Sequence, residues 1–235
     1  MTFTDNGGGS GINFKQKLEN YSSSAQTWNM NLSGGKDGAT VIELNPINGN
    51  LTLGGNLYND DSDDYAVYGA NSKTLTLGST LGVGSTAANV DFSLEQASTV
   101  QINANQSWAG TTFVKAGTMN VANNITLATG TLNISGGTFS TSGANVIGNS
   151  ATVTMSGGNY TLGGSDTVGS VTISGGTLGG TSHTLTGSSY ALSGGNINAI
   201  LGTGNITVTT GAVTLGSAGR LNSGSGVAIN SENLS

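Results

Sequence analysis

The densest group of chemically active side chains in this sequence is a run of acidic residues between two segments of alternating polar and apolar residues. Asp60, Asp61, Asp63 and Asp64 provide four carboxylates within five positions. Carboxylate oxygens are the ligands that Ca²⁺ prefers in proteins, so these four residues form the candidate metal site. The run has no glycine where an EF-hand loop turns and no glutamate where that loop closes. A solvated acidic loop is therefore the first interpretation and a Ca²⁺ site is the alternative, and the sequence indicates no other cofactor.

A second set of reactive residues centres on His183, the sole histidine. A hydrolytic triad would combine His183 with Asp166 and a serine, but the spacing marks no serine for that role. Enzymes that cleave polysaccharides need paired carboxylates, or Ca²⁺-binding carboxylates together with a basic residue. The sequence therefore predicts that the chain is not an enzyme. From residue 106 onward, its charged residues are only Lys115, Asp166, Arg220 and Glu232.

The charge balance narrows the classes of partner. The 235 residues include 6 Lys and Arg against 12 Asp and Glu, which gives a net charge of −6 and a pI near 4.4. Such an acidic chain lacks the basic surface that follows a phosphate backbone, so we expect no binding to nucleic acid. Charged residues make up 8% of the chain, against about 25% in an ordinary soluble domain, which excludes a coiled coil. No cysteine is available for a disulfide or a thiolate–metal site.

Targeting patterns are not visible in the sequence as it stands. Its first ten residues lack the basic stretch and the apolar run of a signal peptide. No segment approaches the roughly 18 apolar residues needed to span a bilayer, so we expect no membrane insertion. Two origins fit these observations: a mature or excised piece of a secreted protein, or an intracellularly made particle component such as a phage protein.

A repeated nine-residue frame dominates the second half of the chain. Each frame alternates polar and apolar residues, turns at a Ser-Gly-Gly triplet and returns to an apolar residue. The turns recur at intervals of about 19 residues, which is a period typical of repeat architectures. The frames are Thr131–Phe139, Thr152–Tyr160, Ser170–Leu178 and Ser189–Ile197, and the first glycines of their turns are Gly136, Gly157, Gly175 and Gly194.

A period of about 19 residues predicts one coil of a β-solenoid. The period is too short for a βαβ unit, but it fits two or three short strands with tight corners, stacked about 4.8 Å from the next coil. We expect one face of each frame to be buried, with Ile134, Met155, Ile173 and Leu192 lying over one another. About ten such coils would form a rod roughly 45–50 Å long.

The two parts of the chain differ in regularity. Residues 49–235 carry the strand-and-turn pattern, loosely at first in Gly49–Leu57 and Lys73–Leu81. Residues 1–48 hold a large share of the charged residues and one of the two tryptophans, so we expect an irregular N-terminal cap or an assembly segment. A cap would cover an open strand edge, which otherwise templates aggregation. We also expect a short helix around Phe14–Tyr21.

The segment Trp108–Val121 resembles the autotransporter-associated β-strand repeat, whose copies read roughly Gly-Thr-Thr-x-Val-x-x-Gly-Thr-Leu-x-Val. Met119 stands where that repeat has leucine, and the resemblance extends loosely over residues 49–215. It implies a right-handed parallel β-helix in large secreted or surface-displayed bacterial proteins, often adhesins or matrix components, and it brings no catalytic residues. The matching positions are Gly110, Thr111, Thr112, Val114, Gly117, Thr118 and Val121.

Together, these observations predict an all-β chain: a right-handed parallel β-helix, or β-solenoid, with an irregular N-terminal cap. We expect a non-enzymatic structural protein of the bacterial cell surface or extracellular matrix. It would self-associate into fibres or layers, because a rod with an uncovered end can stack on its copies. Two alternatives stay open: an adhesin or binding module that contacts surface glycans, and a phage fibre or virion decoration protein.

Overall fold

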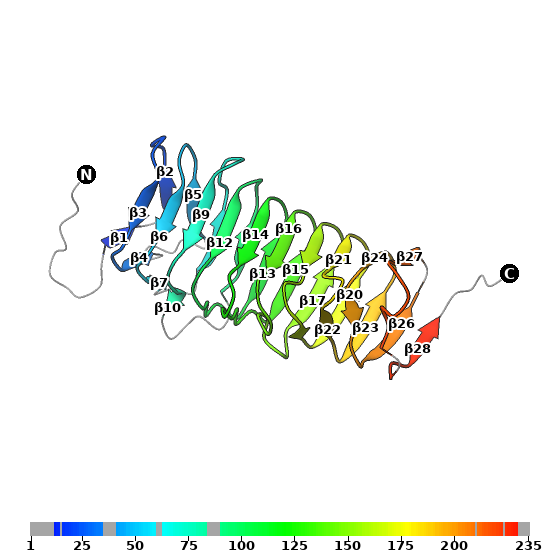
Figure 1. The fold of residues 1–235 in the computed structure, drawn as a ribbon. Helices are drawn as coiled ribbons and strands as arrows, with labels where there is room; N and C mark the ends of the chain where they lie inside the picture. The colour runs from blue at the N-terminus through cyan, green and yellow to red at the C-terminus, as the bar shows by residue number, and fades with distance from the viewer. Residues whose placement is uncertain are drawn as a thin grey trace.

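A computed structural model describes residues 12–14, 16–34, 41–59, 63–83, 90–209, 211–222 and 224–229. Over these ranges the chain is all-β, with no helix, and its paired strands all run parallel. Successive strands occupy three sides in turn, so the chain winds as a three-sided parallel β-solenoid. Figure 1 shows the strands stacked along one axis from the N-terminal to the C-terminal end. The expected fold class is confirmed.

Two long sheets form two of the three sides. The eleven-strand sheet contains β2 (Lys17–Asn20), β5 (Val41–Pro46), β8 (Asp64–Val67), β11 (Phe92–Leu94), β13 (Thr111–Val114), β15 (Thr131–Ile134), β17 (Thr152–Met155), β20 (Ser170–Ile173), β23 (Ser189–Leu192), β26 (Asn205–Val208) and β28 (Val227–Ile229). The ten-strand sheet contains β3 (Gln26–Trp28), β6 (Leu51–Leu53), β9 (Thr74–Leu77), β12 (Thr99–Ile102), β14 (Thr118–Val121), β16 (Thr138–Thr141), β18 (Asn159–Thr161), β21 (Thr177–Gly179), β24 (Gly195–Ile197) and β27 (Val213–Leu215).

The third side is shorter and interrupted. Isolated bridges join Gln106 to Leu127 and Leu127 to Ile147 between its two sheets. One sheet serves the N-terminal coils and the other serves the C-terminal coils. The N-terminal sheet contains β1 (Ile12–Phe14), β4 (Leu32–Gly34), β7 (Leu57–Asn59) and β10 (Leu81–Val83). The C-terminal sheet contains β19 (Asp166–Thr167), β22 (Thr184–Thr186) and β25 (Ile200–Leu201).

The core is a set of apolar columns that run through the stack. Ile134, Met155, Ile173 and Leu192 are consecutive register partners and all are fully buried, as the alternation predicts. Each such side chain stabilises the fold by about 1.5–3 kcal/mol through removal of apolar surface from water. A second column, on the ten-strand sheet, contains Phe139, Tyr160, Leu178 and Ile197.

The number of residues per coil varies along the stack. Leu18 pairs with Leu44 at the start of the stack, and Tyr190 pairs with Ile206 near its end, so the early coil is much the longer of the two. The period expected from the repeated frames therefore holds for the later coils and not for the first ones. The strands of the two long sheets stay in register through this variation, and on the third side the register shifts between Leu81 and Val83 of β10.

The N-terminal residues differ from one of our expectations. No helix forms around Phe14–Tyr21: β2 pairs in parallel with β5, and Leu18 packs against the core, so the helix prediction is wrong. Backbone pairing to the next coil stabilises this segment, which an isolated helical turn could not match. Strands on both sides of residue 48 belong to the same sheets. An assembly role for residues 1–48 stays a prediction.

Each Ser-Gly-Gly corner requires its second glycine. Gly158 has φ +62°, in the left-handed region that other residues adopt at a cost, and the corresponding glycines of the other three frames share this conformation. A methyl group on Gly158 would also lie 2.4 Å from the carbonyl oxygen of Gly136 in the previous coil. Both the local backbone and the coil stacking therefore select glycine here.

We expect Gly158→Ala to lower the free energy of unfolding by about 1–3 kcal/mol from the backbone conformation alone, and by more through the clash. The control is Gly148→Ala, where the nearest atom to the new methyl group would be 3.8 Å away. Urea unfolding followed by circular dichroism would measure both variants. Equal midpoints for the two variants would contradict this account of the corner.

Candidate functional site

The structure describes only part of the acidic run. Asp60 and Asp61 lie outside the described residues, Asp63 is buried, and Asp64 begins β8 in a half-buried position. Within the described ranges, no group of three or more His, Cys, Asp or Glu side chains gathers closely enough to hold a metal ion. The Ca²⁺ site at these four aspartates therefore stays a prediction.

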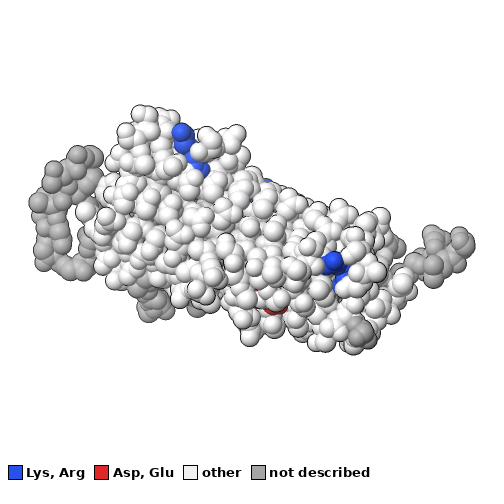
Figure 2. Space-filling model, viewed as in Figure 1, with Lys and Arg blue, Asp and Glu red and all other residues white. Residues whose placement is uncertain are grey.

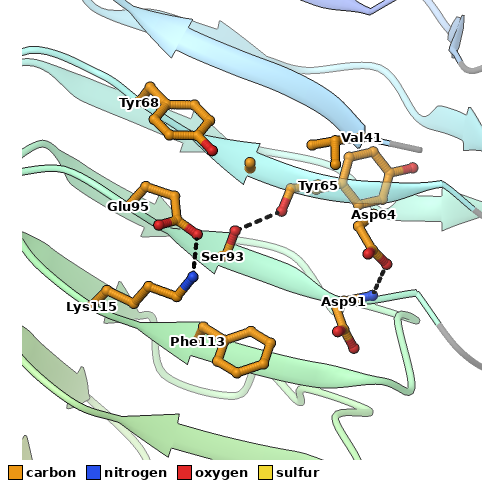
Figure 3. A pocket seen from close by; sticks show the side chains of 10 residues that line it. Val41, Asp64, Tyr65, Tyr68, Asp91, Ser93, Glu95, Phe113 and Lys115 are labelled. Carbon is orange, nitrogen blue, oxygen red and sulfur yellow. Dashed lines mark hydrogen bonds and ion pairs between the residues drawn. The ribbon is translucent and has the colours of Figure 1, made fainter. Parts of the chain in front are cut away.

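A shallow groove lies on the outer face of the eleven-strand sheet, across β5, β8, β11 and β13 (Figure 3). Its volume is about 190 Å³, below the roughly 300–1,000 Å³ of most small-molecule pockets. It is therefore large enough for one small group and not for an extended ligand. The side chains and backbone of Val41, Asp64, Tyr65, Ala66, Tyr68, Asp91, Ser93, Glu95, Phe113 and Lys115 line it.

Residue size and strand register create this hollow. Ala66 and Ser93 are register partners on β8 and β11. Their neighbours in the same column are longer: Glu43 pairs with Ala66 on one side, and Phe113 pairs with Ser93 on the other. The two short side chains thus form a floor, and longer lining side chains such as Phe113 and Tyr68 rise around it.

One wall of the groove is acidic. Asp64 Oδ1 accepts the backbone N–H of Asp91 at 2.8 Å, and Asp91 Oδ1 accepts the N–H of Thr111 at 2.5 Å. Burial raises the pKa of Asp64, and the Asp91 carboxylate raises it further, while the hydrogen bond from Asp91 N–H opposes the rise. Each aspartate therefore ties its coil to the next one, and two like charges stand side by side.

The opposite wall is an ion pair. Lys115 Nζ lies 2.6 Å from Glu95 Oε1 and 5.2 Å from the centre of the Phe113 ring. Figure 3 shows Glu95 and Lys115 pointing toward each other across β11 and β13. The Lys115 side chain is 45% exposed, so solvent weakens the pair to about 0–1 kcal/mol. Because this pair is neutral, the groove takes its charge from the two aspartates.

The groove combines aromatic rings with hydrogen-bond acceptors. Tyr68 is 38% exposed at its edge, and Phe113 lies half-buried at one end. Asp64 and Asp91 use one oxygen each for a backbone N–H, which leaves a second oxygen on each carboxylate. A sugar presents C–H groups that pack on aromatic rings and hydroxyls that donate to carboxylates. The arrangement can therefore hold a single sugar unit or a similar small polar group.

Sequence reasoning did not find this groove. Asp91, Glu95 and Lys115 are each single charges in the sequence, and Asp91 lies 27 residues after Asp64. The shorter period of the later frames would place other residues beside Asp64, so the pattern gave no signal. The longer coils at this end of the solenoid bring these side chains together.

The triad residues considered from the sequence have other partners. Asp166 is buried, and its Oδ2 accepts the N–H groups of Val146 and Ile147 at 3.1 and 3.0 Å, while Oδ1 accepts the N–H of Thr167 at 2.9 Å. Both oxygens thus serve the backbone instead of an imidazole. Burial raises the pKa of Asp166, and these hydrogen bonds oppose the rise. His183 lies at a turn, where its backbone N–H donates to the backbone carbonyl of Gly180.

Comparison with protein families, with curated proteins and with solved structures finds no match to this chain. In the part of the chain that the structure describes, no helix is long and apolar enough to cross a membrane.

We expect Asp64→Asn to melt at a higher temperature than the wild type at neutral pH. The amide oxygen can still accept the Asp91 N–H, while the charge beside the Asp91 carboxylate is removed. A carboxyl whose folded pKa is raised costs stability above its unfolded pKa, and this cost disappears as the pH falls. The advantage of Asp64→Asn should therefore vanish below the ordinary value of 3.8. Thermal unfolding at several pH values measures it, and an advantage that does not change with pH would contradict the charge argument.

Proposed function

We propose that the chain is a non-enzymatic structural protein of the bacterial cell surface or extracellular matrix, in which a stiff β-solenoid acts as a rod. The main support is the unbroken eleven-strand sheet with its in-register apolar columns. Eleven strands at about 4.8 Å spacing give a rod roughly 48 Å long. Such a stack resists bending because every inner coil is bonded to both neighbours. We further propose that these rods self-associate into fibres or layers.

The local structure of Trp108–Val121 supports a likeness to surface-displayed repeat proteins. This segment supplies β13 and β14 of one coil, with Gly117 at φ +63° in the corner between them. The Trp108 ring stacks on Phe92 with 4.6 Å between centroids, and its N–H donates to the Thr112 hydroxyl at 2.9 Å. The motif thus supplies two of the three sides of one coil, which is compatible with a passenger-type β-helix of autotransporter-associated repeats. A secreted or cell-surface location follows as part of the proposal.

Imaging tests the structural function. We expect electron micrographs of the purified chain to show stiff rods, and light scattering to show association that grows with concentration. Labelling in the native cell should place the chain outside the cytoplasm. Compact monomers at every concentration, or a cytoplasmic location, would contradict the proposal.

The groove on the eleven-strand sheet favours carbohydrate contact as a second function. Tyr68 and Phe113 provide ring surface beside the carboxylates of Asp64 and Asp91, over a floor of short side chains. A small open groove would bind one sugar unit weakly, so useful affinity would require many rods on one surface.

We expect Tyr68→Ala to reduce binding on a glycan array, since Tyr68 is the exposed ring at the groove. Tyr21→Ala is the control, because Tyr21 is 64% exposed and does not line the groove. Equal loss in both variants would point to nonspecific contact. An array with no binder for the wild type would remove the carbohydrate function and leave the structural one.

A further inference from the structure

The outward positions of the ten-strand sheet form two continuous columns of short, uncharged polar residues. Register partners on successive strands carry Thr, Asn, Ser or Gln at nearly every level, so the columns extend through most of the rod. The first column consists of Thr74, Thr99, Thr118, Thr138, Asn159, Thr177, Asn196 and Thr214. The second consists of Thr27, Thr52, Thr76, Gln101, Asn120, Ser140, Thr161 and Gly179.

This face is uncharged over all ten of its strands, whereas the eleven-strand sheet carries charge in its N-terminal strands. None of the ten strands contains Lys, Arg, Asp or Glu, although Lys73 directly precedes β9 at a corner. The charged strand residues of the eleven-strand sheet are Lys17, Glu19, Glu43 and Asp64, and Lys115 directly follows β13. The later strands of that sheet, from β15 to β28, are uncharged. Figure 2 shows a surface that is largely free of charged side chains on the side in view. Apart from Lys73, which lies next to Thr74 at a corner, the charged residues of the two long sheets lie outside the strands that form the polar columns.

Most side chains of the face are short, although Gln101 is longer and Gly179 has no side chain. Within each column, neighbouring side chains repeat at the strand spacing of about 4.8 Å, and the two columns are about 6.6 Å apart. Sheets with identical ladders of this kind pack face to face in cross-β structures, where side chains interdigitate and Asn and Gln ladders add hydrogen bonds. An uncharged face of this shape is complementary to a copy of itself.

We propose that these columns are the contact surface for a second copy of the chain, with the two rods side by side about a two-fold axis. The inference rests on the proposed self-association and names the surface that performs it. Repulsion between the negatively charged copies opposes this contact only weakly, because the charged strand residues lie on other sides of the rod. Salt screens the interaction of exposed charges that are more than about 8–10 Å apart. Side-by-side contact leads to layers or bundles instead of single end-to-end fibres.

The available area predicts how strong the contact is. Ten strands span about 43 Å, and four residues of strand span about 13 Å, so each copy offers roughly 560 Å². The total of about 1,100 Å² is near the lower limit for a specific interface. A single pair of rods should therefore associate weakly, and rods concentrated on one surface should associate strongly through their number.

A charge-insertion experiment tests the surface. Thr118 and Thr138 are half-buried register partners on β14 and β16, near the middle of the ten strands. Near a two-fold axis, the double variant Thr118→Lys/Thr138→Lys would place like charges against each other. We expect its association constant in sedimentation equilibrium to fall at least about tenfold.

The matched control is Thr131→Lys/Thr152→Lys, whose residues are half-buried register partners on β15 and β17 of the other long sheet. It adds the same charge and should associate like the wild type. Circular dichroism melting would verify that both double variants fold. Mixing the Thr118→Lys/Thr138→Lys chain with its Glu counterpart should restore association at low salt and lose it at high salt.

The outcomes separate this inference from the function on which it rests. If the wild type associates and the Thr118 and Thr138 variant associates equally well, the contact surface is wrong and the self-associating rod stands. If the wild type stays monomeric at every concentration, both are wrong. If the wild type instead produces thermal hysteresis that only the Thr118 and Thr138 variant loses, the columns bind ice, and the proposed contact is overturned.

Discussion

The parallel register between successive coils is the constraint on which the rest of the molecule depends. Leu132, Val153, Val171 and Tyr190 are register partners on four consecutive strands and are all buried. Because side chains alternate along a strand, a slip of one residue would turn every apolar side chain of a coil outward and every polar one inward. Long and short coils alike keep this alternation on the two long sheets.

The same register organises the surface. When apolar partners lie over one another in the core, the outward residues between them are also aligned, because side chains alternate along each strand. On the ten-strand sheet this alignment converts scattered threonines and asparagines into columns, and on the eleven-strand sheet it places Ala66 beside Ser93 to form the groove floor. The two surfaces therefore have one cause, and they differ in charge and in side-chain length.

Buried polar groups show how the stack tolerates exceptions. The Thr112 hydroxyl lies at an inward position and accepts the Trp108 N–H, then donates to the Thr129 hydroxyl at 3.0 Å. Asp166 satisfies backbone N–H groups of a neighbouring coil where the third side lacks regular pairing. These contacts compensate for desolvation, so polar residues interrupt the core without breaking the stack.

The sequence by itself determined the class of fold, the corner positions and the buried face of each frame, because strand alternation and Gly-Gly turns are local properties. It therefore placed Ile134 over Met155 correctly. Only the tertiary structure decided which distant residues become neighbours, as with Asp64 and Asp91, 27 residues apart. It also decided that Thr74 and Thr99, 25 residues apart, continue one column. The physical reason is that the length of the connections between strands decides which residues of successive coils become partners. Connections of varying length carry no periodic signal in the sequence.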